Sequence, residues 1–182
     1  WQCDNRVSLP MSGTGSAAME ASIANFIEEE ETILIAKKGY FGDRLVDMAS
    51  RYKANVVVME KEWGESFSLE EIKFQIEKNK PSIFAIVHAE TSTGVLQPLE
   101  GIGEICRMNN CLFLVDAVTS LGAVKLLVDD WKIDLAYSCS QKGLSCPPGL
   151  SPFTMNKRAE EKLNNRKSKV PNWYLDLSLL NK

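Results

Sequence analysis

Long apolar runs and an excess of positive charge are both missing from this sequence. No apolar stretch approaches the roughly 18 to 20 residues that a membrane-spanning helix needs, and the N-terminus lacks the basic-then-apolar layout of a secretory signal. The 21 basic and 24 acidic residues leave a net charge of −3, with an isoelectric point near 5.3. This balance gives no electrostatic reason to expect a nucleic-acid or anionic-membrane partner. The sequence therefore predicts a soluble, cytoplasmic protein.

Motifs for metals and for common nucleophiles are also scarce. The five cysteines include no Cys-x-x-Cys pair and His88 is the only histidine, so neither a disulfide framework nor a metal site is expected. The absence of a Gly-Lys dipeptide excludes a P-loop, and the absence of a Gly-x-Ser-x-Gly elbow disfavours a Ser-His-Asp hydrolase. For His88 two roles stay open, a structural hydrogen-bonding histidine or a residue close to a ligand.

Short apolar segments alternate with helical patterns along the 182 residues, and a composition of 45% hydrophobic and 25% charged residues is typical of one folded domain. Because the short segments are apolar on both faces, they fit strands covered by helices on two sides. The sequence predicts a three-layer α/β fold, a mixed, mainly parallel sheet of about seven strands with helices on both faces. The predicted strands are 7–11, 32–36, 55–59, 82–87, 111–115, 133–138 and 150–154, and the predicted helices are 16–27, 42–52, 68–77, 99–108 and 157–165.

A run of small residues follows the first predicted strand and opens directly into a helix. Residues 12–18 read Ser-Gly-Thr-Gly-Ser-Ala-Ala, and apolar residues then surround the helix almost completely, which indicates deep burial. Such a turn offers a phosphate free backbone N–H groups, the hydroxyls of Thr14 and Ser16, and the positive end of the helix dipole. The alternative is a tight turn with a capping serine.

Two ionisable side chains follow later strands, at the edge of the sheet where open α/β folds bind ligands. Asp116 ends an apolar strand, where burial costs free energy unless the carboxylate meets a positive partner. Lys142 follows the next strand, and a lysine enclosed there loses its proton more easily, as Schiff-base chemistry requires. Pyridoxal 5'-phosphate needs a phosphate cradle, a carboxylate for its pyridine nitrogen and an amine for its aldehyde. These three features together predict that cofactor.

Four stretches around these residues resemble the class V aminotransferases of fold type I, and most of all the alanine–glyoxylate and serine–pyruvate aminotransferases. The stretches are residues 12–21, 88–98, 114–122 and 137–143, and the similarity runs through almost the whole chain. The resemblance implies pyridoxal 5'-phosphate as the cofactor. It also implies that Lys142 is the catalytic lysine that forms the Schiff base, and that Asp116 is the partner of the pyridine nitrogen.

Further cofactor-binding positions carry over from the same family pattern. The residues implied to hold the phosphate are Thr14, Gly15, Ser16 and Gln141. Phe41, rather than Tyr40, is implied to stack on the cofactor ring, while Val118 packs on the opposite face. Thr91 is implied to hydrogen-bond the phenolic oxygen. Gln141 stands where related cysteine desulfurases carry His, which favours transamination over sulfur transfer.

The resemblance also concerns parts of the protein beyond these residues. The family has a smaller C-terminal domain that carries the arginine for the substrate carboxylate. Residues 1–182 are therefore expected to be a cofactor-binding large domain without the N-terminal arm and the C-terminal small domain. The resemblance implies a homodimer whose subunits complete each other's active sites. It implies amino transfer from a small amino acid, alanine or serine, to a 2-oxo acid, glyoxylate or pyruvate.

Two other functions stay open. Residues 13–18 fit the Gly-x-Gly-x-x-Gly/Ala fingerprint of a dinucleotide-binding module. Lys37 and Lys38 replace the expected acidic residue, so this module would suit only a dinucleotide with a ribose phosphate, such as NADP. That interpretation leaves Asp116 and Lys142 without a role. The second alternative is a non-catalytic scaffold of the same fold.

Overall fold

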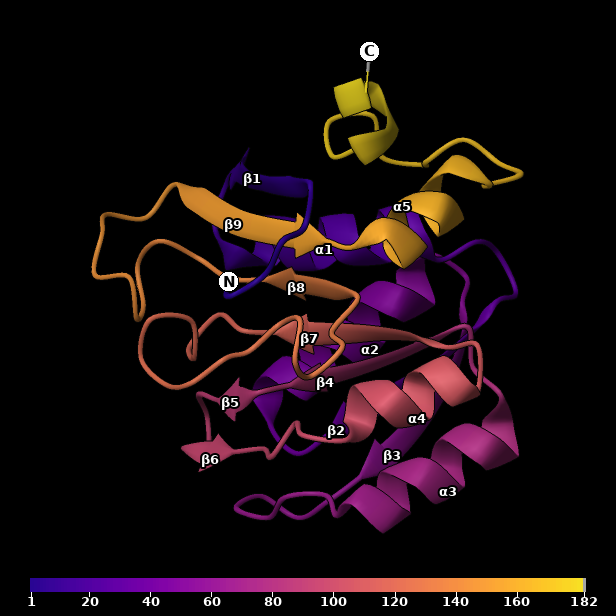
Figure 1. Ribbon diagram of the computed structural model, residues 1–182, viewed down its shortest axis with the longest axis vertical. Coiled ribbons are helices and arrows are strands. Elements are labelled where there is room, and N and C mark those ends of the chain that lie inside the picture. The colour runs from indigo at the N-terminus through magenta and orange to yellow at the C-terminus, as the bar shows by residue number, and fades with distance from the viewer. Residues whose placement is uncertain (182) are drawn as a thin grey trace.

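The computed structural model describes residues 1–181 and shows one large sheet between two layers of helices (Figure 1). The strands of this sheet are β1 (Val7–Ser12), β2 (Thr32–Lys37), β3 (Asn55–Glu60), β4 (Ile83–Val87), β7 (Leu112–Asp116), β8 (Leu135–Tyr137) and β9 (Leu150–Met155). Its seven strands lie in the order β1-β9-β8-β7-β4-β2-β3. Only β9 runs antiparallel to its neighbours, β8 and β1. The predicted mixed, mainly parallel sheet is confirmed.

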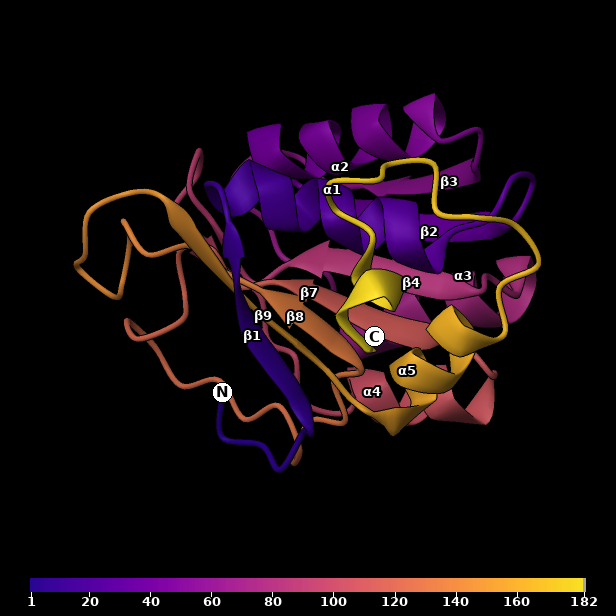
Figure 2. The same ribbon diagram turned by 90° about the horizontal axis from the view of Figure 1, so that it is seen from above.

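Helices cover both faces of the sheet, as Figure 2 shows from above. On one face lie α1 (Gly15–Phe26), α2 (Tyr40–Arg51) and α5 (Lys157–Asn164), and on the other lie α3 (Leu69–Asn79) and α4 (Ile102–Met108). A small second sheet pairs β5 (Ala89–Glu90) with β6 (Val95–Leu96), and a 3-10 helix spans Leu177–Asn181. These short elements were not among the predicted ones.

Alternation along the central strands divides the apolar residues between two cores. In β2, Ile33 and Ile35 join the cluster under α1 and α2, whereas Leu34 and Ala36 join the cluster under α3 and α4. Side chains of a strand point alternately to opposite faces, so a continuous apolar run supplies both cores at once. This explains why the sequence showed no polar face in these strands.

Two predicted elements differ from the structure. The fourth helix begins at Ile102, because Gly101 takes a left-handed conformation with φ of 84° and residues 99–101 form a turn. β3 is an edge strand, not a strand covered on both sides, and Val58 is 40% exposed. α3 begins with a capping box, since Glu71 N–H donates to the Ser68 hydroxyl and the Glu71 carboxylate accepts from Ser68 N–H.

The strand directions bring several carboxyl ends to one edge of the sheet. β1 and β8 both run antiparallel to β9, so β1 points the same way as β8 and the other parallel strands. The residues that follow β1, β7 and β8 therefore meet at that edge, where α1 also begins. Ligands of open α/β sheets bind at this position.

Candidate active site

The turn before α1 presents unused donors. Thr14 is the N-cap residue, but its side chain makes no capping hydrogen bond. The N–H groups of Gly15 and Ser16 belong to the first helical turn, which has no intrahelical acceptors for them. The hydroxyl of Ser151 in β9 donates to the carbonyls of Gly13 (2.8 Å) and Thr14 (2.5 Å), which fixes the turn from below. The free N–H groups and the missing side-chain cap favour an anion-binding turn over a tight turn with a capping serine.

Gly15 is required at this turn by close packing. A Cβ atom there would lie 2.8 Å from Val118 Cγ2 and 3.3 Å from Cys139 Cβ. Backbone N–H groups of the turn consequently approach the segment that follows β7, where Val118 is located. The predicted phosphate turn and the predicted ring-packing residue thus lie in contact range of each other.

Asp116 is a buried carboxylate without a cationic partner. It is 2% exposed, and within residues 1–181 no Lys, Arg or His nitrogen lies within ion-pair distance of it. Oδ2 accepts from the Tyr137 hydroxyl at 2.8 Å and Oδ1 accepts from Val118 N–H at 2.9 Å. Burial raises the pKa of Asp116 to about 6 despite both donors. The geometry leaves this carboxylate able to stabilise a bound cation such as a protonated pyridine nitrogen.

A pocket of about 260 Å³ joins the turn, Asp116 and Lys142. It is lined by Thr14, Gly15, Ser16, Met19, Phe41, Arg44, Asp116, Val118, Gln141 and Lys142. Phe41 lines this pocket, whereas Tyr40 does not line it and is 54% exposed. Oε1 of Gln141 is buried and has no hydrogen-bond partner in the described part of the chain.

Two predicted site residues differ from expectation in their surroundings. Lys142 lines the pocket but is exposed, so residues 1–181 alone do not provide the predicted enclosure. The physical reason is that the segment after it, residues 144–150, lies at the surface. Thr91 does not line the pocket; it is exposed, and its Oγ1 lies 2.6 Å from Oγ1 of Thr119.

Glu90, which the sequence analysis missed, links two segments of the site. Its Oε1 accepts from the N–H and the hydroxyl of Ser92 (3.2 and 2.8 Å) and from Phe41 N–H (3.4 Å). Glu90 is 1% exposed and precedes Thr91 directly, so it fixes the Thr91 segment against the start of α2. The sequence carries no signal for it like that of Asp116, because residues 88–93 read His-Ala-Glu-Thr-Ser-Thr and a carboxylate is unremarkable in a polar segment.

The residues present fit pyridoxal 5'-phosphate. The turn at α1 suits the phosphate, Asp116 suits the pyridine nitrogen, and Phe41 and Val118 supply apolar surfaces for a flat ring. The amine of Lys142 lies at the same pocket.

Comparison with known proteins assigns the family. A family model for class V aminotransferases matches residues 9–169. The chain belongs to the class V aminotransferases. Members of this family with this fold depend on pyridoxal 5'-phosphate, and the predicted family, fold and cofactor are confirmed.

Individual class V relatives are similar over most of this chain. The chain is 47% identical over 167 residues to the (S)-ureidoglycine–glyoxylate transaminase of Bacillus subtilis, which covers 92% of the chain and 40% of the relative. It is 41% identical over 182 residues to the alanine–glyoxylate aminotransferase of Rattus norvegicus, which covers 100% of the chain and 44% of the relative. A crystal structure of an alanine–glyoxylate aminotransferase from Nostoc sp. is 60% identical, with a TM-score of 0.98 over 100% of this chain and 48% of that chain. The chain therefore spans less than half the length of these class V relatives.

The lysines that the dinucleotide alternative needs are not available in this class V domain. Lys37 Nζ forms ion pairs with Asp43 (2.9 Å) and Glu60 (2.7 Å). Lys38 is 1% exposed, its Nζ donates to the Val95 carbonyl at 3.2 Å, and burial lowers its pKa to about 8. Neither side chain is placed to bind a ribose phosphate, so this alternative is not favoured.

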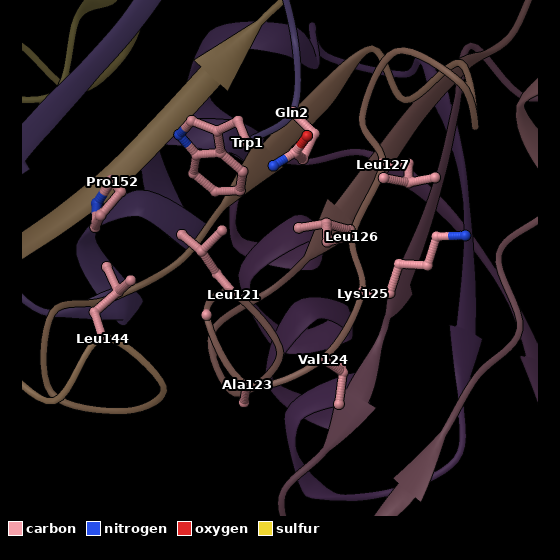
Figure 3. Close-up of a pocket in the computed structure, with 11 residues that line it drawn as sticks. Trp1, Gln2, Leu121, Ala123, Val124, Lys125, Leu126, Leu127, Leu144 and Pro152 are labelled. Carbon is pink, nitrogen blue, oxygen red and sulfur yellow. The ribbon is translucent and has the colours of Figure 1, made fainter.

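A second, larger pocket of about 840 Å³ is lined by a different set of residues, which includes Leu144, two residues after Lys142. Figure 3 shows Trp1, Leu121, Leu126, Leu144 and Pro152 around it. Asp116 and Lys142 do not line it, and its walls are mainly apolar.

Within residues 1–181 no helix has the length and apolar character for crossing a membrane. The same residues contain no group of three or more His, Cys, Asp or Glu side chains arranged to bind a metal ion.

Proposed function

We propose that the protein catalyses pyridoxal-phosphate-dependent amino transfer from a small amino acid, alanine or serine, to a 2-oxo acid, glyoxylate or pyruvate. The observation that carries this proposal is the buried, unpaired Asp116 at the same pocket as the anion turn and Lys142. The names of the relatives support the acceptor, since both the alanine and the ureidoglycine enzymes are named for glyoxylate.

The proposed roles follow from the position of each group. Pyridoxal 5'-phosphate supplies, when bound, an aldehyde carbon that amines attack and a ring that withdraws electrons. Thr14, Gly15, Ser16 and Gln141 bind the phosphate, and Phe41, Val118 and Thr91 orient the ring. Asp116 holds a proton on the pyridine nitrogen, because its carboxylate in a dry site stabilises the adjacent cation.

Lys142 has two tasks in this proposal. Its Nζ would hold the cofactor through the aldehyde carbon, and the amine of the substrate would displace it there. The freed Nζ would then accept the proton from the substrate Cα. Both tasks need water to be kept from Nζ, yet Lys142 is exposed within the described chain. The proposal therefore includes a homodimer in which the partner subunit covers the mouth of the pocket.

Exposed apolar side chains support the homodimer. Val124 is 41% exposed, Leu144 is 38% exposed and Leu150 is 50% exposed, and Val124 and Leu144 line the larger pocket of Figure 3. Apolar patches of this kind are characteristic of subunit interfaces. We also propose that residues 1–182 are the cofactor-binding large domain of a cytoplasmic enzyme, and that the substrate-carboxylate arginine lies in a separate small domain.

The test is borohydride reduction of the full-length protein loaded with cofactor, followed by peptide mass mapping. We expect the phosphopyridoxyl group on Lys142 and not on Lys38, the buried lysine whose lowered pKa makes it the natural competitor. A Lys142→Arg variant should carry no label, while Lys38→Arg should keep it. A label on Lys38 or another lysine contradicts the assignment of Lys142. No label on any lysine contradicts the proposed function and supports the non-catalytic scaffold.

Turnover assays then test the substrates. The full-length protein is supplied with alanine, serine or ureidoglycine as donor and with glyoxylate or pyruvate as acceptor. The proposal expects turnover with alanine or serine to exceed that with ureidoglycine. The reverse order would replace the donor and keep the reaction class.

A further inference from the structure

Arg44 is a half-buried cation in the site that family resemblance left without a role. It lies in the first turn of α2, three residues after Phe41, and lines the same pocket as Asp116 and Lys142. Its Nη1 donates to Ser16 Oγ at 2.9 Å. Its guanidinium carbon lies 4.8 Å from the centre of the Phe41 ring and 5.3 Å from that of Tyr40. Two aromatic rings and a hydroxyl therefore hold the side chain in place.

The charge of Arg44 is not neutralised by its surroundings. No carboxylate of the described chain lies within ion-pair distance of it, whereas Lys37 and Arg51, which lie seven residues before and after it in the sequence, both form ion pairs. An arginine that contacts aromatic rings and a hydroxyl but no carboxylate can donate its free N–H groups to a bound anion.

The phosphate of the cofactor needs such a charge. A phosphate group carries about two negative charges at neutral pH, while the N-terminus of a helix offers about half a positive charge. The other cation that lines the pocket, Lys142, is committed to the aldehyde in the proposed function. Ser16, one of the proposed phosphate donors, is already in hydrogen-bond contact with Arg44.

We propose that Arg44 binds the cofactor phosphate together with the turn at the start of α1, as the fixed positive charge of that site. This inference rests on the proposed function. The planar guanidinium can donate to a phosphate oxygen while remaining stacked on Phe41, so one side chain orders both the anion site and the ring that packs on the cofactor.

The experiment compares two ligands on the cofactor-free, full-length protein. Pyridoxal 5'-phosphate and pyridoxal differ only in the phosphate, and inorganic phosphate is added as a competitor. Spectroscopic titration gives the dissociation constant of each for the parent, Arg44→Met and Arg44→Lys. Arg51→Met is the matched control, because Arg51 is on the same helix, is exposed and pairs only with Asp47.

The expected result is a selective loss. Arg44→Met should lower the affinity for pyridoxal 5'-phosphate by about 10- to 100-fold, as expected for a lost charge-assisted hydrogen bond, and inorganic phosphate should compete less well. The affinity for pyridoxal should change by less than about twofold. Arg44→Lys should recover part of the affinity, and Arg51→Met should behave as the parent does.

Three results would overturn the proposal. Equal losses for both ligands mean that Arg44 acts on the ring through Phe41, tighter binding of both means that it occupies the space of the ring, and unchanged binding means that it has no role. A parent protein that binds neither ligand refutes the proposed function itself, whereas a parent that binds both while Arg44→Met matches it refutes only the assignment of Arg44.

Discussion

The buried carboxylate of Asp116 costs the folded protein stability in the absence of the cofactor. Its pKa rises from the ordinary 3.8 to about 6, chiefly because of burial. The folded state therefore binds this proton more tightly than the unfolded state, so the favourable contribution is complete below pH 3.8 and is lost as the pH rises through about 6. A pKa shift of about two units, at about 1.4 kcal/mol per unit, corresponds to about 3 kcal/mol of folding free energy lost once Asp116 is ionised.

Asp116→Asn should accordingly stabilise the cofactor-free protein. Asn keeps the acceptor for Val118 N–H, and its amide can donate to the Tyr137 hydroxyl. The variant therefore removes the buried charge, and the hydroxyl proton of Tyr137 gives up its acceptor. We expect the free energy of unfolding to increase by up to about 3 kcal/mol above about pH 7, with the gain vanishing near pH 4. Urea titrations of parent and variant between about pH 4 and 8 measure this difference.

A second buried aspartate provides the control. Asp134 is fully buried and accepts from Arg158 Nη1 at 2.8 and 2.9 Å, from Asn156 Nδ2 at 2.7 Å and from Phe113 N–H at 2.9 Å. Asp134→Asn removes the partner of a half-buried arginine and should destabilise the protein by about 2 kcal/mol. The two substitutions should therefore change the free energy of unfolding in opposite directions, Asp116→Asn upward and Asp134→Asn downward. If Asp116→Asn destabilises the protein as Asp134→Asn does, or stabilises it equally at every pH, the reasoning is refuted.

Two further predictions concern the neighbours of this site. Tyr137→Phe removes the donor to Asp116 Oδ2, so the pKa of Asp116 should climb above about 6 and the pH dependence of unfolding should move upward in the same urea series; an unmoved pH dependence would contradict the role of the hydroxyl. Gly39→Ala places a Cβ 2.5 Å from Glu90 Cγ and Ser92 Oγ, which should cost about 1 to 3 kcal/mol in urea unfolding; an Ala variant as stable as the parent would show that Glu90 moves freely.

The sequence indicated candidate site residues wherever a residue type conflicts with its local pattern. Asp116 is a carboxylate at the end of an apolar strand, and residues 12–18 form an unusual run of small side chains at a helix start. Both signals can be recognised without a structure. The strands of the main sheet were predictable for a related reason, since continuous apolar runs serve two cores at once.

The partners of these residues were not predictable, because they depend on pairing between strands. Tyr137 contacts Asp116 because β7 and β8 pair in a register that sets the two residues opposite each other. No local pattern in residues 133–138 contains that register. Arg44 is an intermediate case, because its spacing of three residues from Phe41 puts both on one helix face, but its contact with Ser16 depends on how α1 and α2 pack.

The pairing of β1 with β9 has a consequence for when the protein can first bind its cofactor during synthesis. The turn before α1 leaves the ribosome well before β9, yet Gly13 N–H donates to the Gly149 carbonyl and Ser151 Oγ donates to the carbonyls of Gly13 and Thr14. These contacts join residues 136 to 138 positions apart, so their formation closes a long loop and comes late in folding. A nascent chain that ends before Gly149 contains Thr14, Ser16, Asp116 and Lys142 but lacks the strand that holds the backbone of Gly13 and Thr14 in place. The turn is thus held in place only after β9 has been made.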